Sequence, residues 1–201
     1  MKPQIILVTG EVEGPFLTKI LREFKESLTI SHVQSQVELS KIFKTTCRFP
    51  SLRLIGFCTS IIVPANVVTT LPGLAYNFHP APPSYPGVNA ANFAIYNGEE
   101  RFGVTAHVMH EQVDAGPIVG VDWFDIPEHF NHVDLETKAF STLLRLFHQL
   151  CPLLVETETP LPELNIQWSG QVTRRKDFEN LTAPLSVMSE AEMDRRKRAF
   201  G

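Results

Sequence analysis

The chain has 201 residues, 43% of them hydrophobic, and its 18 Lys and Arg residues are set against 22 Asp and Glu residues, a formal net charge of −4. This length suits one domain with a buried core and is short for two, and the charge argues against a protein whose whole surface binds nucleic acid. No apolar stretch approaches the ~20 residues of a membrane-spanning helix. The first residues fit a strand better than a secretion signal, so we expect a cytoplasmic protein.

The first half of the chain alternates short apolar runs with segments of helical periodicity. The expected strands are 5–9, 29–33, 52–57 and 74–77, and the expected helices are 16–27, 37–43 and 64–71. Strands that alternate with helices predict a mainly parallel, twisted sheet covered on both faces. The fold class expected is therefore α/β, a Rossmann-like three-layer fold.

The second half opens with a rigid proline-rich loop at 80–83 and continues the alternation. A helix is expected at 89–96, strands at 102–109 and 118–124, and a long helix at 133–155. Ser189 followed by Glu192 resembles a capping box that starts a last helix. Because the composition changes after Thr157, we expect a catalytic domain at 1–157 and a C-terminal extension at 158–201 packed on or near it.

Three polar side chains stand where chemistry is expected. Asn77 and His79 follow an apolar run, and Asp114 lies on the loop between two predicted strands. Ligands of open parallel sheets bind beyond the carboxyl ends of the strands. An amide donor can stabilise the oxyanion of a tetrahedral intermediate, imidazole can move protons near neutral pH, and a carboxylate can orient that imidazole. The set suits acyl transfer to an amine if the fold brings Asp114 to His79.

Several motifs in one order resemble the folate-dependent formyltransferase family, which includes glycinamide-ribonucleotide, methionyl-tRNA and sugar-nucleotide N-formyltransferases. The motifs are Asn77-x-His79-Pro80, Pro86-Gly87, Ala94-Ile95-Tyr96-Asn97-Gly98, Gly103-Val104-Thr105-x-His107 and Asp114-x-Gly116-x-Ile118. The resemblance is strongest over residues 50–125 and implies the formyltransferase type of α/β fold. It also implies that Asn77, His79 and Asp114 are catalytic.

The same resemblance implies 10-formyltetrahydrofolate as the formyl donor and no metal. Thr105 and His107 are expected to support the catalytic loop. The residues expected to bind the folate are Phe57, Thr59, Ser60, Ile61, Ile62, Val113 and Gly116.

Two features bear on the acceptor. The loop at 9–14 carries Glu11 and Glu13, which would repel a phosphate and count against glycinamide ribonucleotide. The chain is also short for the tRNA-binding domain of methionyl-tRNA formyltransferases. The resemblance therefore favours a small primary amine, for instance that of an amino sugar nucleotide.

Departures from the family pattern leave other interpretations open. The loop after His79 is one residue shorter than is usual in the family. Hydrolysis of formyltetrahydrofolate at the same site is one alternative, and a non-catalytic module that binds folate or nucleotide is another. A homodimer is among the assemblies that the sequence leaves open, whereas a nucleic-acid partner and a membrane are not expected.

The three cysteines, Cys47, Cys58 and Cys151, are odd in number and widely spaced. This spacing favours neither a disulfide framework nor a zinc site. Reduced thiols are therefore expected.

Overall fold

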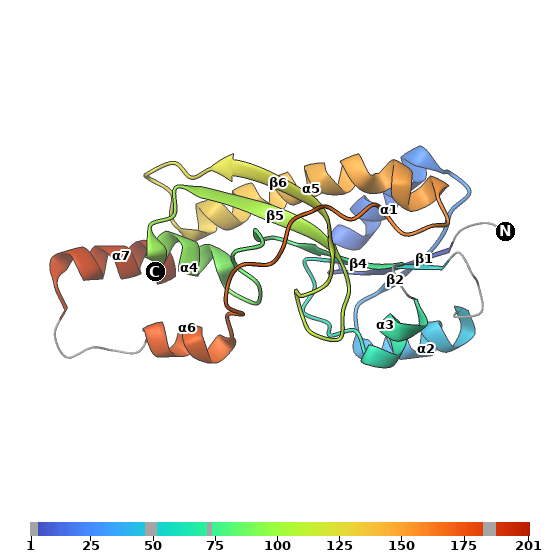
Figure 1. Cartoon of the computed structure of the whole chain (residues 1–201), viewed down its shortest axis with the longest axis horizontal. Coiled ribbons are helices and arrows are strands. Elements are labelled where there is room, and N and C mark those ends of the chain that lie inside the picture. Colours follow the sequence, from blue (N-terminus) through green and yellow to red (C-terminus); the bar gives the residue numbers. More distant parts are fainter. Residues whose placement is uncertain (1–3, 47–51, 72–73, 183–187) are drawn as a thin grey trace.

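The computed structural model describes residues 4–46, 52–71, 74–182 and 188–201 (Figure 1). They build a six-stranded sheet in the order β2-β1-β3-β4-β5-β6. The strands are β1 (Gln4–Val8), β2 (Thr29–Val33), β3 (Arg53–Phe57), β4 (Ala75–His79), β5 (Arg101–Val108) and β6 (Ile118–Asp125). The first four strands run parallel, and β5 and β6 are antiparallel. The expected α/β fold with a mainly parallel sheet is confirmed.

Helices cover both faces of this sheet, as the alternation in the sequence predicted. They are α1 (Glu13–Phe24), α2 (Gln36–Thr46), α3 (Ala65–Thr70), α4 (Ala90–Asn97), α5 (His132–Glu156), α6 (Arg175–Thr182) and α7 (Glu190–Phe200). Alternate residues of β1 point to opposite faces. Ile5 and Leu7 join the core under α1 and α5, whereas Ile6 and Val8 join the core under α2 and α3 (Figure 1).

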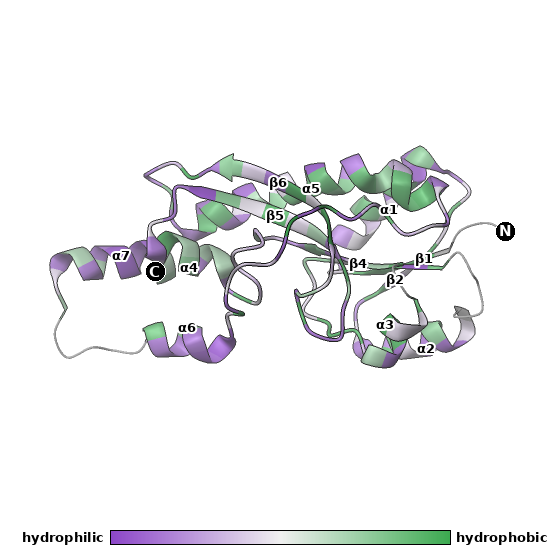
Figure 2. Cartoon of the chain, viewed as in Figure 1, coloured by the Kyte–Doolittle hydropathy of each residue, from purple (hydrophilic) through white to green (hydrophobic). Residues whose placement is uncertain are grey.

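Element boundaries agree with the sequence expectations to within a few residues, with one exception. The short helix α6 was not expected, and it buries none of its residues. Figure 2 shows that α6 and α7 are mostly hydrophilic. Local bonds define α6 instead, since the backbone N–H of Arg174 donates to Oδ2 of Asp177 over 2.7 Å.

The long helix α5 begins with a capping box that was not among the sequence predictions. Asn131 accepts the N–H of Asp134, and the carboxylate of Asp134 accepts the N–H of Asn131. The predicted cap of α7 is half formed. Ser189 accepts the N–H of Glu192, but the Glu192 carboxylate turns to Tyr96 and Arg196.

The C-terminal segment contacts the rest of the molecule at both ends. Arg53, fully buried at the start of β3, donates to the carbonyls of Thr157 and Thr159 just after α5. At the far end, α7 packs on α4, and the Asn92 side chain donates to the carbonyl of Ala199. The segment between them runs from α5 past β5 and β6 to α6 (Figure 1).

Among the described cysteines, Cys58 and Cys151 are free thiols. Cys47 lies outside the described residues. In the described part of the chain, no helix combines the length and apolarity that crossing a membrane requires.

Candidate active site

The polar residues singled out in the sequence lie on neighbouring strands. Asn77 is the central residue of β4 and His79 its last, so the pleat puts both on one side while Tyr76 and Phe78 enter the core on the other. Residues of β5 lie directly opposite. His107 pairs with Asn77, and Thr105 pairs with His79.

Asp114 comes to these strands from the loop between β5 and β6. Its Oδ2 atom lies 3.6 Å from Nδ1 of His79, and its Oδ1 atom lies 3.2 Å from Nε2 of His107. Nδ2 of Asn77 is 3.4 Å from Oδ1 of Asp114. The structure thus brings together Asn77 and His79 of β4, His107 of β5 and Asp114 of the following loop.

Backbone groups fix the carboxylate. The N–H of Gly87 donates to Oδ2 of Asp114 over 2.9 Å. Asp114 itself has a left-handed backbone with φ of 47°, a conformation that non-glycine residues adopt rarely and that is common at functional sites. Burial alone would raise the pKa of Asp114. The hydrogen bond with His107, the electrostatic interaction with His79 and the N–H of Gly87 outweigh burial and lower the pKa of Asp114, so this group is a carboxylate at neutral pH.

His79 is held in one tautomer. Its Nε2 atom lies 3.1 Å from the carbonyl oxygen of Tyr85, which can only accept, so Nε2 carries the proton and Nδ1 faces Asp114. Burial lowers the pKa of His79 below 6.5, against the opposing effects of Asp114 and the Tyr85 carbonyl. The resting imidazole is therefore neutral at pH 7, with its basic nitrogen toward the carboxylate.

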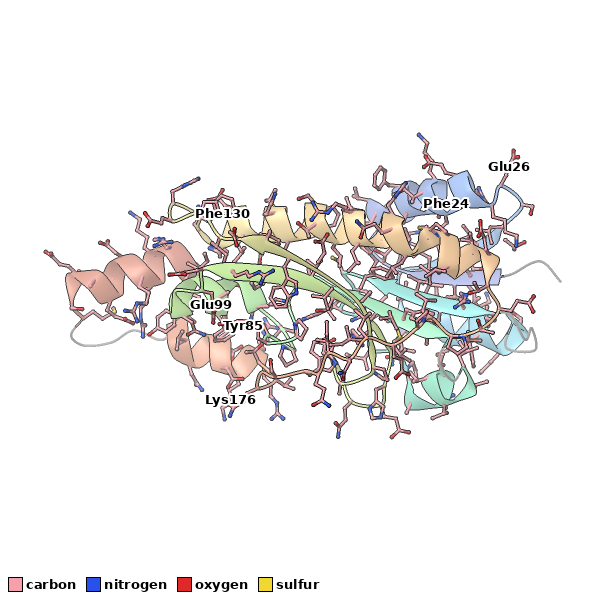
Figure 3. All side chains as sticks on the ribbon, turned by 45° about the horizontal axis from the view of Figure 1, so that its top comes forward. Phe24, Glu26, Tyr85, Glu99, Phe130 and Lys176 are labelled. Atoms are coloured by element: carbon pink, nitrogen blue, oxygen red, sulfur yellow. The ribbon has the colours of Figure 1, made fainter. Side chains whose placement is uncertain are left out.

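Further bonds hold the loop that follows β4. The hydroxyl of Thr105 donates to the carbonyl of Ala81 over 2.8 Å. The hydroxyl of Tyr85 donates to the carboxylate of Glu99 over 2.7 Å (Figure 3). Since the Tyr85 carbonyl accepts the hydrogen bond from Nε2 of His79, these bonds orient the imidazole indirectly.

Two clefts meet at Asn77 and Thr59, which line both. The larger has a volume of about 610 Å³ and is also lined by His79 and by Glu136, Thr137 and Phe140 of α5. The smaller, of about 90 Å³, has an apolar part of its wall formed by Ile61, Ile62, Val63, Val68, Met109 and Val113, and a polar part that includes Asp114, His107, His110, Glu111 and Gln112. The catalytic candidates thus stand between two separate ligand spaces.

The residues expected to bind folate divide between these places. Thr59, Ile61, Ile62 and Val113 line the smaller cleft, whereas Ser60 lines the larger one. Gly116 lines neither cleft. Phe57 is 0% exposed and packs on Phe78, Phe140 and Phe147 in the core. The Phe57 side chain therefore belongs to the core, and the assignment of the whole set, Phe57 and Gly116 included, to folate stays a prediction.

Three contributions were missed by sequence reasoning. Gly87 belonged to a quoted motif, but its donation to Asp114 depends on the folded loop. Glu136 lies at a solvent-facing position of the helical pattern, so nothing in the sequence pointed to a role in the site. Trp168 packs against both imidazoles from the C-terminal extension, and its only signal was an isolated aromatic residue in a polar stretch.

Within the described ranges, no cluster of three or more His, Cys, Asp or Glu side chains is arranged to hold a metal ion.

Comparison with known proteins relates this site to one family. Residues 50–142, which include Asn77, His79 and Asp114, match the family model for formyl transferase.

Solved structures show the same fold over nearly the whole chain. An N-formyltransferase from Helicobacter canadensis, in complex with folinic acid and dTDP-3-aminofucose, superimposes with a TM-score of 0.72 at 17% identity, covering 100% of this chain and 81% of that one. A sugar N-formyltransferase from a Shewanella species gives 0.79 at 17% identity, with 98% and 87% covered. The formyltransferase PseJ from Anoxybacillus kamchatkensis, in complex with tetrahydrofolate and a UDP-linked formamido sugar, gives 0.72 at 20% identity, with 88% of each chain covered. At these identities the likeness establishes the fold.

Proposed function

Because residues 50–142 match the family model for formyl transferase, we propose that this chain transfers a formyl group from 10-formyltetrahydrofolate to the primary amine of an amino sugar nucleotide. The observation that carries the proposal is the position of Asn77 and Thr59 in the walls of both clefts. Group transfer between two substrates needs two binding spaces that meet at the reacting atoms.

The chemistry of each cleft suggests its occupant. The apolar wall of the smaller cleft, formed by Ile61, Ile62 and Val113 among others, suits the flat ring system of a folate. The larger cleft, of about 610 Å³, lies in the range of sites for drug-sized ligands and suits an acceptor far larger than water. The Helicobacter protein was solved with folinic acid and an amino sugar nucleotide, which supports this assignment.

The reaction follows from the positions of the side chains. The amine nitrogen attacks the formyl carbon, a C–N bond forms, and the carbonyl oxygen becomes an oxyanion. The Nδ2 donor of Asn77 stabilises that oxygen. Asp114, ionised at neutral pH, accepts the amine proton directly or through water. Nδ1 of His79, 3.6 Å away, takes the proton up, and the resulting imidazolium also stabilises the oxyanion before it protonates the departing folate nitrogen.

The products are an N-formylated amine and tetrahydrofolate. The proposed catalytic residues are therefore Asn77, His79 and Asp114, with Thr105 and His107 in support. A cytoplasmic location is part of the proposal and agrees with the free thiols of Cys58 and Cys151, which suit a reducing compartment.

Product analysis tests the proposal. The protein is mixed with 10-formyltetrahydrofolate and dTDP-3-aminofucose. The N-formylated sugar nucleotide, formate and tetrahydrofolate are then measured. Transfer predicts tetrahydrofolate formation that depends on the amine, and roughly 10²–10³-fold lower kcat in Asn77→Ala. Formate released at the same rate without amine would assign hydrolysis instead. Binding of both ligands without turnover over a broad panel of amines would make the protein a non-catalytic module.

A further inference from the structure

Trp168 lies against both imidazoles of the site although it comes from the C-terminal extension. Its ring centroid is 5.0 Å from that of His107 at an interplanar angle of 88°. The distance to His79 is 6.0 Å at 62°. Both arrangements are edge-to-face contacts, which the ring quadrupoles favour.

The indole nitrogen has its own partner. Nε1 of Trp168 donates to the carbonyl of Gly116 over 2.8 Å, two residues after Asp114. One side chain therefore contacts both imidazoles and also binds the loop that supplies the carboxylate. Trp168 lines neither of the two clefts, so any action on the chemistry is exerted through its neighbours.

The segment around Trp168, which we call the 161–173 strap, is bonded along its length to strands and loops around the site. Its backbone N–H groups donate from Leu161 to the Tyr76 hydroxyl, from Leu164 to the Ile118 carbonyl, from Ser169 to the Pro83 carbonyl and from Thr173 to the Pro86 carbonyl. Close packing adds to these bonds. A Cβ atom at Gly170 would lie 1.8 Å from the carbonyl oxygen of Ser84, so this approach requires glycine.

These bonds connect the two loops that meet at Asp114. On one side the strap holds Pro83 and Pro86, next to the Gly87 donor; on the other it holds Gly116 and Ile118, next to Asp114 itself. The distance between the Gly87 N–H and the Asp114 carboxylate is therefore set partly by the strap.

We propose that Trp168 is a positioning residue and that the 161–173 strap is part of the catalytic unit rather than an appendage to it. The indole shields His79 and His107 from water on the side away from the substrates, and its N–H fixes the Asp114 loop. The role in turnover rests on the formyl transfer proposed above. The shielding of the imidazoles does not.

The surroundings of His79 predict the direction in which its pKa shifts when the indole is removed. The groups that face this imidazole are Asp114, His107 and the Tyr85 carbonyl, and Glu136 lines the same cleft. Burial is the largest cause of the lowered pKa of His79. Removing the indole admits water, so the pKa of His79 should rise toward its ordinary value of 6.5.

Kinetics of two variants separate packing from the hydrogen bond. Trp168→Phe keeps an aromatic edge and loses only the N–H donor, so kcat should fall by a few-fold, about the effect of one neutral hydrogen bond. Trp168→Ala loses both contacts, so kcat should fall by roughly 10- to 100-fold with little change in KM, and the acidic limb of the kcat profile should move to higher pH. Trp123→Phe is the matched control, since Trp123 is 37% exposed on β6 and lines neither cleft.

A fluorescence titration tests the contact without any assay of activity. The chain has two tryptophans, so Trp123→Phe leaves Trp168 as the only indole, and a protonated imidazole in contact with an indole quenches its emission. Emission should fall on acidification in this variant, and the transition should weaken when His79 is also replaced by Gln.

Each outcome decides one question. Emission that does not change with pH, or that changes equally after His79→Gln, would overturn the contact even in an active enzyme. Wild-type kcat and an unmoved pH profile in folded Trp168→Ala would overturn the positioning role. A protein that transfers no formyl group but shows the expected titration would instead refute the proposed function and leave the shielding intact.

Discussion

Two charge states at the site follow from its contacts and have opposite causes. Burial holds His79 neutral, whereas the polar contacts of Asp114 hold it ionised in spite of burial. A neutral base beside a carboxylate, at 3.6 Å, is the arrangement needed to accept a proton from an attacking amine and pass it on.

The buried imidazole should also make stability depend on pH. The pKa of His79 is lower in the folded state than in the unfolded chain, so at pH values between the two the unfolded state binds more protons. Its contribution to stability is thus present above the unfolded pKa of about 6.5 and is lost as pH falls through the folded pKa. Urea unfolding between about pH 7 and pH 5 should show a decrease that His79→Gln reduces.

A substitution of an exposed side chain that does not titrate is the control for this effect. Val37→Gln, at a position that is 79% exposed on α2, should keep the wild-type slope of unfolding free energy against pH. Equal slopes for the wild type and His79→Gln would mean that the His79 imidazole titrates alike in the folded and unfolded states.

Gly87 is the residue at which backbone freedom matters most. Its φ is 101°, and a Cβ atom there would lie 2.2 Å from the carbonyl oxygen of Thr173. Gly87→Ala should therefore shift the loop, lengthen the bond to Asp114 and reduce kcat by roughly 10²-fold, with about 1–3 kcal/mol lost in the free energy of unfolding. Gly98→Ala is a useful comparison, because φ is 72° there too but no atom lies within 4 Å. If both variants keep full kcat, the Gly87 N–H has no part in positioning the carboxylate.

At the scale of elements, a buried cation joins the start of β3 to the end of α5. None of the bonds described for this cation is made to a carboxylate. The guanidinium of Arg53 donates to the Tyr76 hydroxyl and to the carbonyls of Thr157 and Thr159. Backbone carbonyls of a helix end are natural partners of a cation. This junction sets where the 161–173 strap begins.

Arg53→Met keeps the length of the side chain and removes every donor. The carbonyls of Thr157 and Thr159 then lose buried partners, so the free energy of unfolding should fall by about 2–4 kcal/mol. Arg22→Met, on the exposed side of α1, should change it by less than about 0.5 kcal/mol. Chemical denaturation measures both, and similar values for the two variants would show that the junction is not a source of stability.

At the scale of the whole molecule, the sequence predicted those features of the fold and site that depend on the pattern of neighbouring residues. Apolar runs located every strand, and the periodicity of 133–155 located α5. Asn77 and His79 could be placed at a strand end because ligand sites of parallel sheets lie there. Phe57 was placed by the same reasoning from the strand end, but the pattern did not show that its side chain lies in the core. The contact of Trp168 with His107 joins residues on distant segments, and no local pattern encodes it.

Binding of a folate should stabilise the molecule through the smaller cleft alone. A ligand at 100 times its Kd adds about 2.7 kcal/mol to the stability of the folded state, which for a chain of this size raises Tm by roughly 5–10 °C. Folinic acid should produce this shift in the wild type. Val113→Asp, which puts a charge into the apolar wall, should abolish it, whereas Val37→Asp on the exposed surface of α2, where Val37 is 79% exposed, should not. An equal shift in both variants would place the folate outside the smaller cleft, and the larger cleft would then have to hold the donor.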